Sequence, residues 1–115
     1  MPLGDLEREV MTQLWGSAGP LSVRQVHEAI RGRDLAYTTV MTVLDRLAKK
    51  GVVNRERDGR AWLYAPVQTR EQMTAGLMMD ALEDTPDQDA ALAHFVGRLS
   101  PEALAAAIEA ARRQG

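Results

Sequence analysis

The chain of 115 residues contains no cysteine, which excludes disulfide bonds, thiolate metal sites and cysteine nucleophiles within this sequence. Its length fits one domain, or one small domain with an appendage. The net charge of −2 argues weakly against nucleic-acid binding, but residues 31–66 hold eight Lys and Arg against four Asp and Glu, and residues 67–115 hold four against eight. A basic middle followed by an acidic region is typical of a DNA-binding protein with a separate partner region.

No apolar run in the sequence approaches the ~20 residues that a helix needs to cross a bilayer. The first ten residues, MPLGDLEREV, are acidic and amphipathic rather than basic and apolar. We therefore expect no signal peptide, no membrane partner and a cytoplasmic protein.

Two amphipathic helices are predicted before residue 34. The first runs from about Leu3 to Trp15, and its apolar stripe consists of Leu6, Val10, Met11 and Leu14. The second begins after the capping box Ser22-x-x-Gln25, buries Val23, Val26 and Ile30, and ends at Arg31-Gly32-Arg33. Short links between helices of this length predict a compact three-helix core once a third helix crosses them.

The third helix is predicted from Ala36 to Lys50, with Gly51 as its C-terminal stop. Its buried face carries Val40, Val43, Leu44 and Leu47, at spacings i, i+3, i+4 and i+7. Its other face carries Thr38, Thr39, Met41, Thr42, Asp45, Arg46 and Lys49. Three threonines in the first two turns are unusual because β-branched residues lower helix propensity. Their short hydroxyl side chains suit a helix whose N-terminal end enters a major groove.

A β-hairpin is predicted after Gly51, with Asp58-Gly59 as its two-residue turn. This register pairs Arg57 with Arg60, Arg55 with Trp62, and Val53 with Tyr64. Like charges across a strand pair are unfavourable, so the arginine pair indicates an anionic partner such as DNA phosphate. The alternative is that Glu56 and Asp58 neutralise the tip. Trp62 and Tyr64 are expected to pack the sheet against the helices, with Val52, Ala61 and Leu63 supplying core from the other face.

Three further amphipathic helices are predicted after Pro66. The capping boxes Thr69-x-x-Gln72 and Thr85-x-x-Gln88, with Pro86 as first helical residue, begin two of them, and Ser100-Pro101-Glu102 begins the last. Such short helices do not bury their apolar stripes alone. We expect a second copy of the chain to cover them; the alternative is a monomer whose helices fold back on its own core. The predicted dimerisation residues are Leu77, Met78, Leu82, Leu92, Phe95, Leu99, Leu104 and Ile108.

The order helix, glycine, hairpin is that of a winged helix-turn-helix. The predicted fold is mainly α with a small β-hairpin wing, followed by a C-terminal helical dimerisation region. We place the DNA-binding domain at residues 1–67 and the dimerisation domain at residues 68–115. In this arrangement Thr38, Thr39 and Thr42 read bases, and phosphate contacts come from Arg46, Lys49, Arg57 and Arg60. Tyr37 is a further candidate for a phosphate contact. The alternative is that these polar residues only form a solvated face.

Four stretches resemble the penicillinase-repressor family of BlaI/MecI type: DLEREVMTQLW, SVRQVHEAI, LAYTTVMTVLDRLAKKGVV and RERDGRAWLYAPV. The resemblance covers nearly all of residues 1–85 and is most specific in AYTTVMTVLDRLAKKG. It implies a winged-helix domain, a helical dimerisation domain and repression at palindromic operators. The best-known members control β-lactamase or resistant penicillin-binding protein genes, so the resemblance implies a role in antibiotic resistance or another stress response. There, proteolysis of the repressor, triggered by a membrane sensor of β-lactam, relieves repression.

Two departures from the family bear on this regulation. The proteolysed members are cut at an Asn-Phe bond, whereas the only asparagine here is Asn54 and the only phenylalanine is Phe95. The copper-responsive branch carries a C-terminal cysteine cluster, which a chain without cysteine lacks. Three alternatives are therefore left open for the effector: a protease acting elsewhere, a small molecule, or neither.

Three other classes of protein compete with a DNA-binding repressor. An enzyme is not expected, because His27 and His94 belong to no visible triad and there is no Gly-rich phosphate loop. No cofactor or metal is expected either: Asp84, Asp87 and Asp89 lack the glycine and terminal glutamate of a calcium loop and are better read as cap and linker. A protein-interaction winged helix would not need both Arg57 and Arg60, and a ligand-sensing winged-helix regulator stays open.

Overall fold

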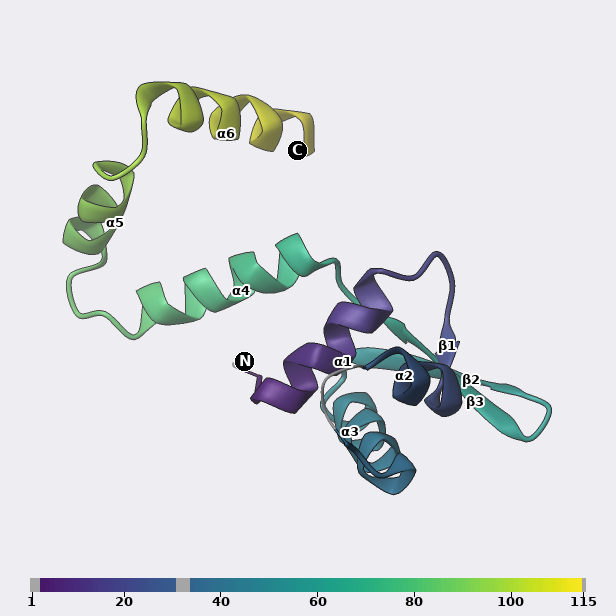
Figure 1. Cartoon of the computed structure of the whole chain (residues 1–115). Helices are drawn as coiled ribbons and strands as arrows, with labels where there is room; N and C mark the ends of the chain where they lie inside the picture. Colours follow the sequence, from purple (N-terminus) through teal and green to yellow (C-terminus); the bar gives the residue numbers. More distant parts are fainter. Residues whose placement is uncertain (1–2, 31–33, 115) are drawn as a thin grey trace. The chain divides into compact units, whose positions relative to one another are not determined.

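The computed structural model describes residues 3–30 and 34–114. Its elements, in chain order, are α1 (Asp5–Trp15), β1 (Leu21–Ser22), α2 (Val23–Ala29), α3 (Tyr37–Lys49), β2 (Val53–Asp58), β3 (Ala61–Pro66), α4 (Arg70–Glu83), α5 (Gln88–Val96) and α6 (Pro101–Gln114) (Figure 1). They form two compact units, Met1–Gly76 and Leu77–Gly115. The predicted Arg31-Gly32-Arg33 end of the second helix lies outside the described residues.

The first unit is built on a core that α1, α2 and α3 share with the small sheet (Figure 1). The predicted stripes are confirmed except at Leu6, which is only half-buried. The buried apolar side chains are Val10, Met11, Leu14, Val23, Val26, Ile30, Val40, Val43, Leu44, Leu47, Val53 and Tyr64. Full burial of one such aliphatic side chain stabilises the fold by about 1.5–3 kcal/mol relative to exposure. This core therefore holds the three helices in a fixed arrangement.

Side chains near the helix ends satisfy the first free backbone N–H groups of α1 and α2. The Ser22 hydroxyl accepts a 3.1 Å hydrogen bond from the Gln25 amide, and the Gln25 side chain accepts one of 2.9 Å from the Ser22 amide. This reciprocal pair confirms the predicted capping box. At α1, the Glu7 carboxylate accepts a 3.1 Å hydrogen bond from the backbone of Gly4.

The sheet has three antiparallel strands in the order β1-β3-β2. The strand β1 was not predicted, because two residues are too few to show an alternating pattern. Leu21 pairs with Tyr64 and Ser22 with Leu63, so β1 ties the start of α2 to the wing.

The hairpin register differs from the predicted one. Asp58 pairs with Ala61, so the turn residues are Gly59 and Arg60 rather than Asp58 and Gly59. Asp58-Gly59 as a type I′ turn would require positive φ at both residues, and no described residue other than glycine has positive φ. Gly59, with φ of 63°, takes the first turn position, where a type II′ turn favours glycine.

The corrected register changes every predicted cross-strand pair. Arg57 faces Trp62, Arg55 faces Tyr64, and Val53 faces Pro66. The predicted pair of Arg57 with Arg60 is therefore wrong, and the argument for an anionic partner from two opposed arginines falls with it. The expected packing of Tyr64 and Trp62 is confirmed, because Tyr64 is buried with Val53 and Trp62 packs against the core. Ala61, which was expected to supply core from the other face, is exposed. Leu63 and Val52 are half-buried, and Val52 packs against the core.

The helices α4, α5 and α6 begin mostly as predicted. Thr69 and Gln72 form the predicted capping box, with hydrogen bonds of 2.9 and 3.1 Å, and the Ser100 hydroxyl accepts from Ala103. The predicted Thr85 cap is wrong. Asp87 caps α5 by accepting from the Ala90 amide. The Thr85 hydroxyl instead donates to the carbonyl of Ala81, one turn back in α4.

No residue of α4, α5 or α6 is buried. Exposed apolar side chains instead lie on all three helices, among them Met78, Met79, Leu92, Phe95, Val96 and Ile108. These helices therefore lack the burial that stabilises α1, α2 and α3.

Candidate nucleic-acid interface

The helix α3 presents one polar stripe to solvent. Thr38, Thr42, Asp45 and Lys49 lie at spacings i, i+4, i+7 and i+11, and therefore share one face. Thr38, Thr42 and Lys49 are exposed, and Asp45 is half-buried. Of the remaining predicted site residues on this helix, Arg46 is exposed and Thr39 is half-buried. Burial of Val40, Val43, Leu44 and Leu47 on the opposite face fixes which side chains point outward.

The Thr42 side chain is held in one orientation. Its hydroxyl donates a 2.9 Å hydrogen bond to the carbonyl oxygen of Thr38. A threonine bound in this way keeps its acceptor lone pairs and its methyl group for an outside partner. Against a major groove, these groups suit an exocyclic amine of adenine or cytosine, or a thymine methyl.

His27 and Tyr37 stabilise the entry to α3. A 2.7 Å hydrogen bond joins His27 Nε2 to the carbonyl oxygen of Leu35. The imidazole also lies edge-on to the Tyr37 ring, with 5.9 Å between ring centroids. Tyr37 is 46% exposed, so its ring is held on one side and open on the other. His27 thus has a structural role.

Asp45 links α3 to the wing through both oxygens of its carboxylate. Oδ2 lies 3.1 Å from Lys49 Nζ, and Oδ1 accepts a 3.2 Å hydrogen bond from the Arg55 guanidinium. The hydrogen bond from Lys49 lowers the pKa of Asp45, desolvation opposes it only in part, and the charges of Lys49 and Arg55 lower it further. Asp45 is therefore a carboxylate at neutral pH and brings a helix cation and a wing cation to one place.

The ring of Trp62 on β3 contacts the guanidinium groups of two arginines on β2. The guanidinium carbons of Arg55 and Arg57 lie 4.5 and 4.9 Å from the centroid of its ring system. Cation–π contacts at such distances restrict both side chains without neutralising their charge. Arg55 was not among the predicted site residues. The sequence pattern that could have identified Arg55 is its spacing of two residues from Arg57, which puts both side chains on one face of the strand.

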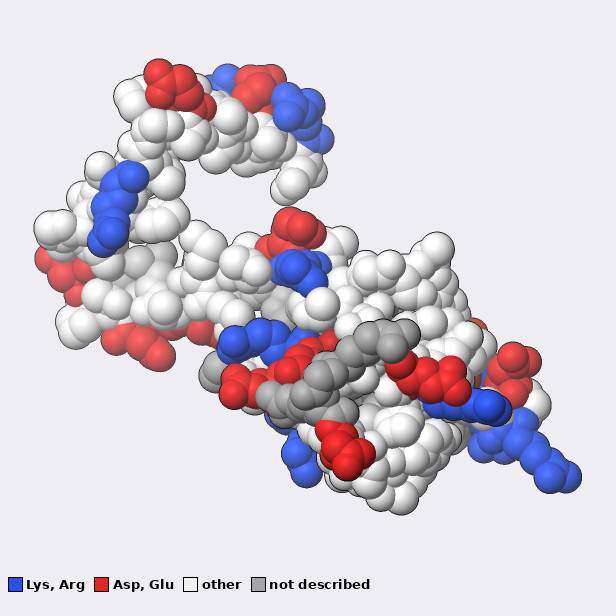
Figure 2. Space-filling model, in the orientation of Figure 1, with Lys and Arg blue, Asp and Glu red and all other residues white. Residues whose placement is uncertain are grey.

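The end of the hairpin carries charge of both signs. Arg60 is exposed in the turn beside exposed Asp58 and Gly59. Figure 2 shows basic side chains extending from the end of the hairpin next to acidic ones. The structure therefore brings Arg57 onto the α3-facing side of β2 with Arg55, while Arg60 lies separately in the turn.

An ion pair between exposed Lys50 and buried Glu7 anchors the C-terminal end of α3 to α1. The Nζ atom of Lys50 lies 2.9 Å from Glu7 Oε2, and Glu7 is 8% exposed. Burial raises the pKa of Glu7, but the hydrogen bonds from Lys50 and Gly4 and the nearby positive charge outweigh it. The pKa of Glu7 is thus held below its usual range, and this charged pair stabilises α3 against α1.

The predicted dimerisation residues are accessible. Met78, Leu92, Phe95 and Ile108 are 44–49% exposed. Leu77, Leu82, Leu99 and Leu104 are half-buried. Contact between these apolar side chains and water is unfavourable. A partner surface that buried them would lower the free energy of the protein.

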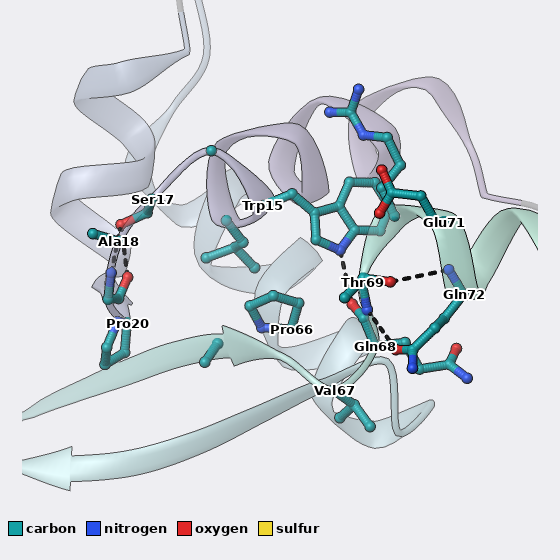
Figure 3. A pocket seen from close by; sticks show the side chains of 15 residues that line it. Trp15, Ser17, Ala18, Pro20, Pro66, Val67, Gln68, Thr69, Glu71 and Gln72 are labelled. Carbon is teal, nitrogen blue, oxygen red and sulfur yellow. Dashed lines mark hydrogen bonds between the residues drawn. The ribbon is translucent and has the colours of Figure 1, made fainter. Parts of the chain in front are cut away.

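A cleft of about 710 Å³ lies in the first unit, where α1 leads to β1 and β3 leads to α4 (Figure 3). Its walls include Trp15, Pro20, Pro66 and Val67. The Trp15 indole N–H donates a 2.9 Å hydrogen bond to the carbonyl of Gln68, and the Arg70 guanidinium lies 5.2 Å from the Trp15 ring. The cleft has a mainly apolar lining. The Trp15 indole N–H is already hydrogen-bonded to Gln68 and is not free for a ligand.

Among residues 3–30 and 34–114, no group of three histidine, aspartate or glutamate side chains is arranged to hold a metal ion. No helix in the described part of the chain has the length and apolar character of a membrane span.

Comparison with known proteins agrees with this geometry. A family model described as penicillinase repressor matches residues 3–112. The transcriptional regulator BlaI of Mycobacterium tuberculosis is 59% identical over 104 residues, which cover 87% of this chain and 75% of that protein. The solution structure of the DNA-binding domain of the repressor BlaI is 30% identical, with a TM-score of 0.53, and the match covers 59% of this chain and 83% of that one.

A MarR family protein from Bacillus stearothermophilus shares the fold at 18% identity, with a TM-score of 0.53 over 99% of this chain and 74% of that one. The predicted winged-helix fold and the resemblance to BlaI-type repressors are thus confirmed. The matched family consists of repressors and not of enzymes, as the sequence indicated.

Proposed function

The chain belongs to the penicillinase repressor family, and from this membership and the interface geometry we propose that it is a homodimeric repressor of palindromic operator DNA. The observation that carries the proposal is the 3.2 Å ion pair between Asp45 on α3 and Arg55 on the wing. It holds the exposed face of the helix and the cations of the hairpin on one surface. A DNA duplex meets both elements at once in a winged-helix complex.

The chemistry of the side chains on that surface determines which part of the DNA each of them contacts. Thr38, Thr39 and Thr42 are short enough to approach base edges when α3 lies in the major groove. Arg46, Lys49, Arg57 and Arg60 supply contacts to phosphates, which give affinity that falls as salt rises. We assign DNA binding to residues 1–67.

Dimerisation is assigned to residues 68–115. The support is the absence of any buried residue in α4, α5 and α6, together with their exposed leucine, methionine and phenylalanine side chains. A twofold dimer pairs each such surface with its own copy. Two recognition helices then lie one helical turn of DNA apart, about 34–36 Å, or a multiple of it. The expected operator is therefore an inverted repeat, with promoters of β-lactam-response or other stress genes as the expected sites.

These 115 residues contain no Asn-Phe bond, so cleavage of such a bond has no site within them. Two routes fit the chain: proteolysis at another bond, or a small-molecule effector. The cleft beside Trp15 favours testing the second, because it lies where β3 leads into α4 (Figure 3). An occupant there contacts the end of the winged helix and the start of α4 together.

The test is recovery of genomic fragments from the source organism by the purified, folded protein at ~150 mM salt, which suppresses much purely electrostatic binding. We expect a short inverted repeat upstream of a few genes, and those genes identify the inducing signal. A folded protein that enriches no fragment over random DNA contradicts the proposal and favours a protein-interaction winged helix.

A further inference from the structure

Asp45 is an acidic residue in the middle of the surface that the proposed function assigns to DNA. It shares one face of α3 with Thr38, Thr42 and Lys49. A carboxylate at this position repels phosphate, and therefore opposes binding to any duplex. Structural support of the helix does not require it, because the apolar face alone packs α3 on the core.

The carboxylate engages two of the cations nearest to it. Lys49 Nζ lies 3.1 Å from Oδ2 and the Arg55 guanidinium 3.2 Å from Oδ1, so each oxygen binds one cation. Both cations are partly exposed, with side-chain exposures of 77% for Lys49 and 37% for Arg55. They are therefore within reach of phosphate, but their charge is already partly satisfied by Asp45 at the protein surface.

Arg55 is the more constrained of the two. It is held by Asp45 on one side and lies 4.5 Å from the centroid of the Trp62 ring on the other. Because Arg55 belongs to β2 and Asp45 to α3, the contact fixes the wing relative to the recognition helix. When two contact surfaces are held in place before binding, a ligand that touches both binds with a smaller loss of entropy. A ligand that touches only one surface gains no affinity from this arrangement.

We propose that Asp45 is a positioning residue that sets DNA specificity: it withholds Lys49 and Arg55 from sequence-independent attraction to phosphate and fixes the wing for the operator. This inference rests on the proposed function. Non-specific binding is almost entirely electrostatic, so withholding cations weakens it most. Operator binding retains the threonines, the cations that Asp45 does not engage (Arg46, Arg57 and Arg60), and a phosphate contact from Lys49 that Asp45 weakens.

The test compares Asp45→Asn with wild type on a random-sequence duplex and on a fragment recovered by the wild-type protein, from ~50 to ~300 mM salt. One additional phosphate contact steepens the salt slope by about 0.9, equivalent to about eightfold tighter random binding at ~100 mM salt. The ratio of operator to random affinity is expected to fall at least as much, because the wing is no longer fixed.

The control is Glu56→Gln, which removes the same charge one residue from Arg55. Glu56 lies on the opposite face of β2 and forms no ion pair with any residue that the structure describes. We expect its salt slope to change much less than that of Asp45→Asn. Asp45→Glu keeps a carboxylate that reaches the same cations, and is expected to restore most of the wild-type ratio.

An Asp45→Asn protein whose random binding and slope match those of Glu56→Gln overturns the inference. So does loss of operator affinity alone, since that identifies Asp45 as a base-reading residue. Failure of the wild-type protein to bind any duplex is a different result, and overturns the proposed function together with this inference.

Discussion

The winged-helix elements and the three C-terminal helices both carry many apolar side chains, but their burial is opposite. Residues of α1, α2 and α3 join the sheet in a core where Val10, Met11, Val40, Leu44 and Leu47 have no exposed surface. The helices α4, α5 and α6 carry apolar side chains too, yet none of their residues is buried. An apolar stripe predicts that a helix is covered, and does not say by which chain.

The comparison implies that the two regions depend on different partners for stability. The first contains within one chain all that its helices need. The second is marginal alone, because isolated helices shorter than about 12–15 residues are barely stable in water. Substitutions in the two regions are therefore expected to report on different equilibria, unfolding in one case and association in the other.

The largest effect is expected from Phe95→Asp, which places a charge on an exposed apolar position of the proposed dimer surface. An unpaired charge in an apolar interface costs several kcal/mol, enough to shift association by about a thousandfold. Sedimentation should then show monomers at concentrations where wild type is dimeric. A variant that still sediments as a dimer places the interface away from Phe95. The matched control is Glu102→Gln, a change on the exposed first turn of α6.

Leu44→Ala is expected to destabilise the first region by about 2–5 kcal/mol, because it leaves a cavity in a fully buried site. Leu92→Ala is its control in the second region. Leu92 is 44% exposed, so in the single chain its truncation should cost less than about 1 kcal/mol. Urea unfolding, with protein concentration varied, separates the two effects. If Leu44→Ala and Leu92→Ala lost equal stability, and neither loss depended on protein concentration, the two regions would not differ in the way proposed.

Arg57→Ala combined with Arg60→Ala is expected to weaken binding to all DNA sequences by about sixtyfold at ~100 mM salt and to flatten the salt slope by about 2. The control is Arg98→Ala with Arg112→Ala, which removes the same charge from the second region. Fluorescence anisotropy with a labelled duplex measures both. An unchanged slope in the hairpin variant removes Arg57 and Arg60 from the interface, and an equal change in the control means that only net charge matters.

Glu7→Gln has the smallest expected effect, about 1–2 kcal/mol lost at pH 7 from a hydrogen-bonded charged pair. The folded-state pKa of Glu7 is lowered, so its contribution is present above its unfolded-state pKa, about 4.3, and is lost as pH falls through the folded value. As the pH falls below about 5, the wild-type protein should therefore lose more stability than the variant. The extra loss should roughly equal the difference in stability between the two proteins at pH 7. Parallel thermal-unfolding curves down that range would contradict this.

Much of the first region could be predicted from the sequence because its signals are local. The spacing of Val40, Val43 and Leu47 identifies the buried face of α3, and Ser22 with Gln25 identifies the start of α2. Each pattern lies within about two helical turns, so no distant contact decides it.

The errors lie where backbone geometry or distant pairing decides. The Asp58-Gly59 signal was read as the turn, but only Gly59 takes positive φ, and this shifts Arg57 from Arg60 to Trp62. The strand β1 exists only because β3, some forty residues later, pairs with it. Thr85 and Asp87 both have side chains suited to a helix cap, and composition does not choose between them.

The candidate site was predicted as a set of cations and threonines, but its organisation was not. Asp45 was placed on the correct face without a role. Its contacts to Lys49 and Arg55 depend on the true hairpin register and on how the wing meets α3. Periodicity gives the face of an element and leaves contacts between elements undetermined.

Sedimentation equilibrium of the full chain, across a range from nanomolar to tens of micromolar, tests the contrast between the two regions most directly. The single chain has a mass of 12.7 kDa. We expect twice this mass at micromolar concentration, falling toward the single-chain mass on dilution, and Phe95→Asp should remain at the single-chain mass throughout. A wild-type protein that stays at the single-chain mass at every concentration would contradict it, because the apolar faces of α4, α5 and α6 would then need no second copy.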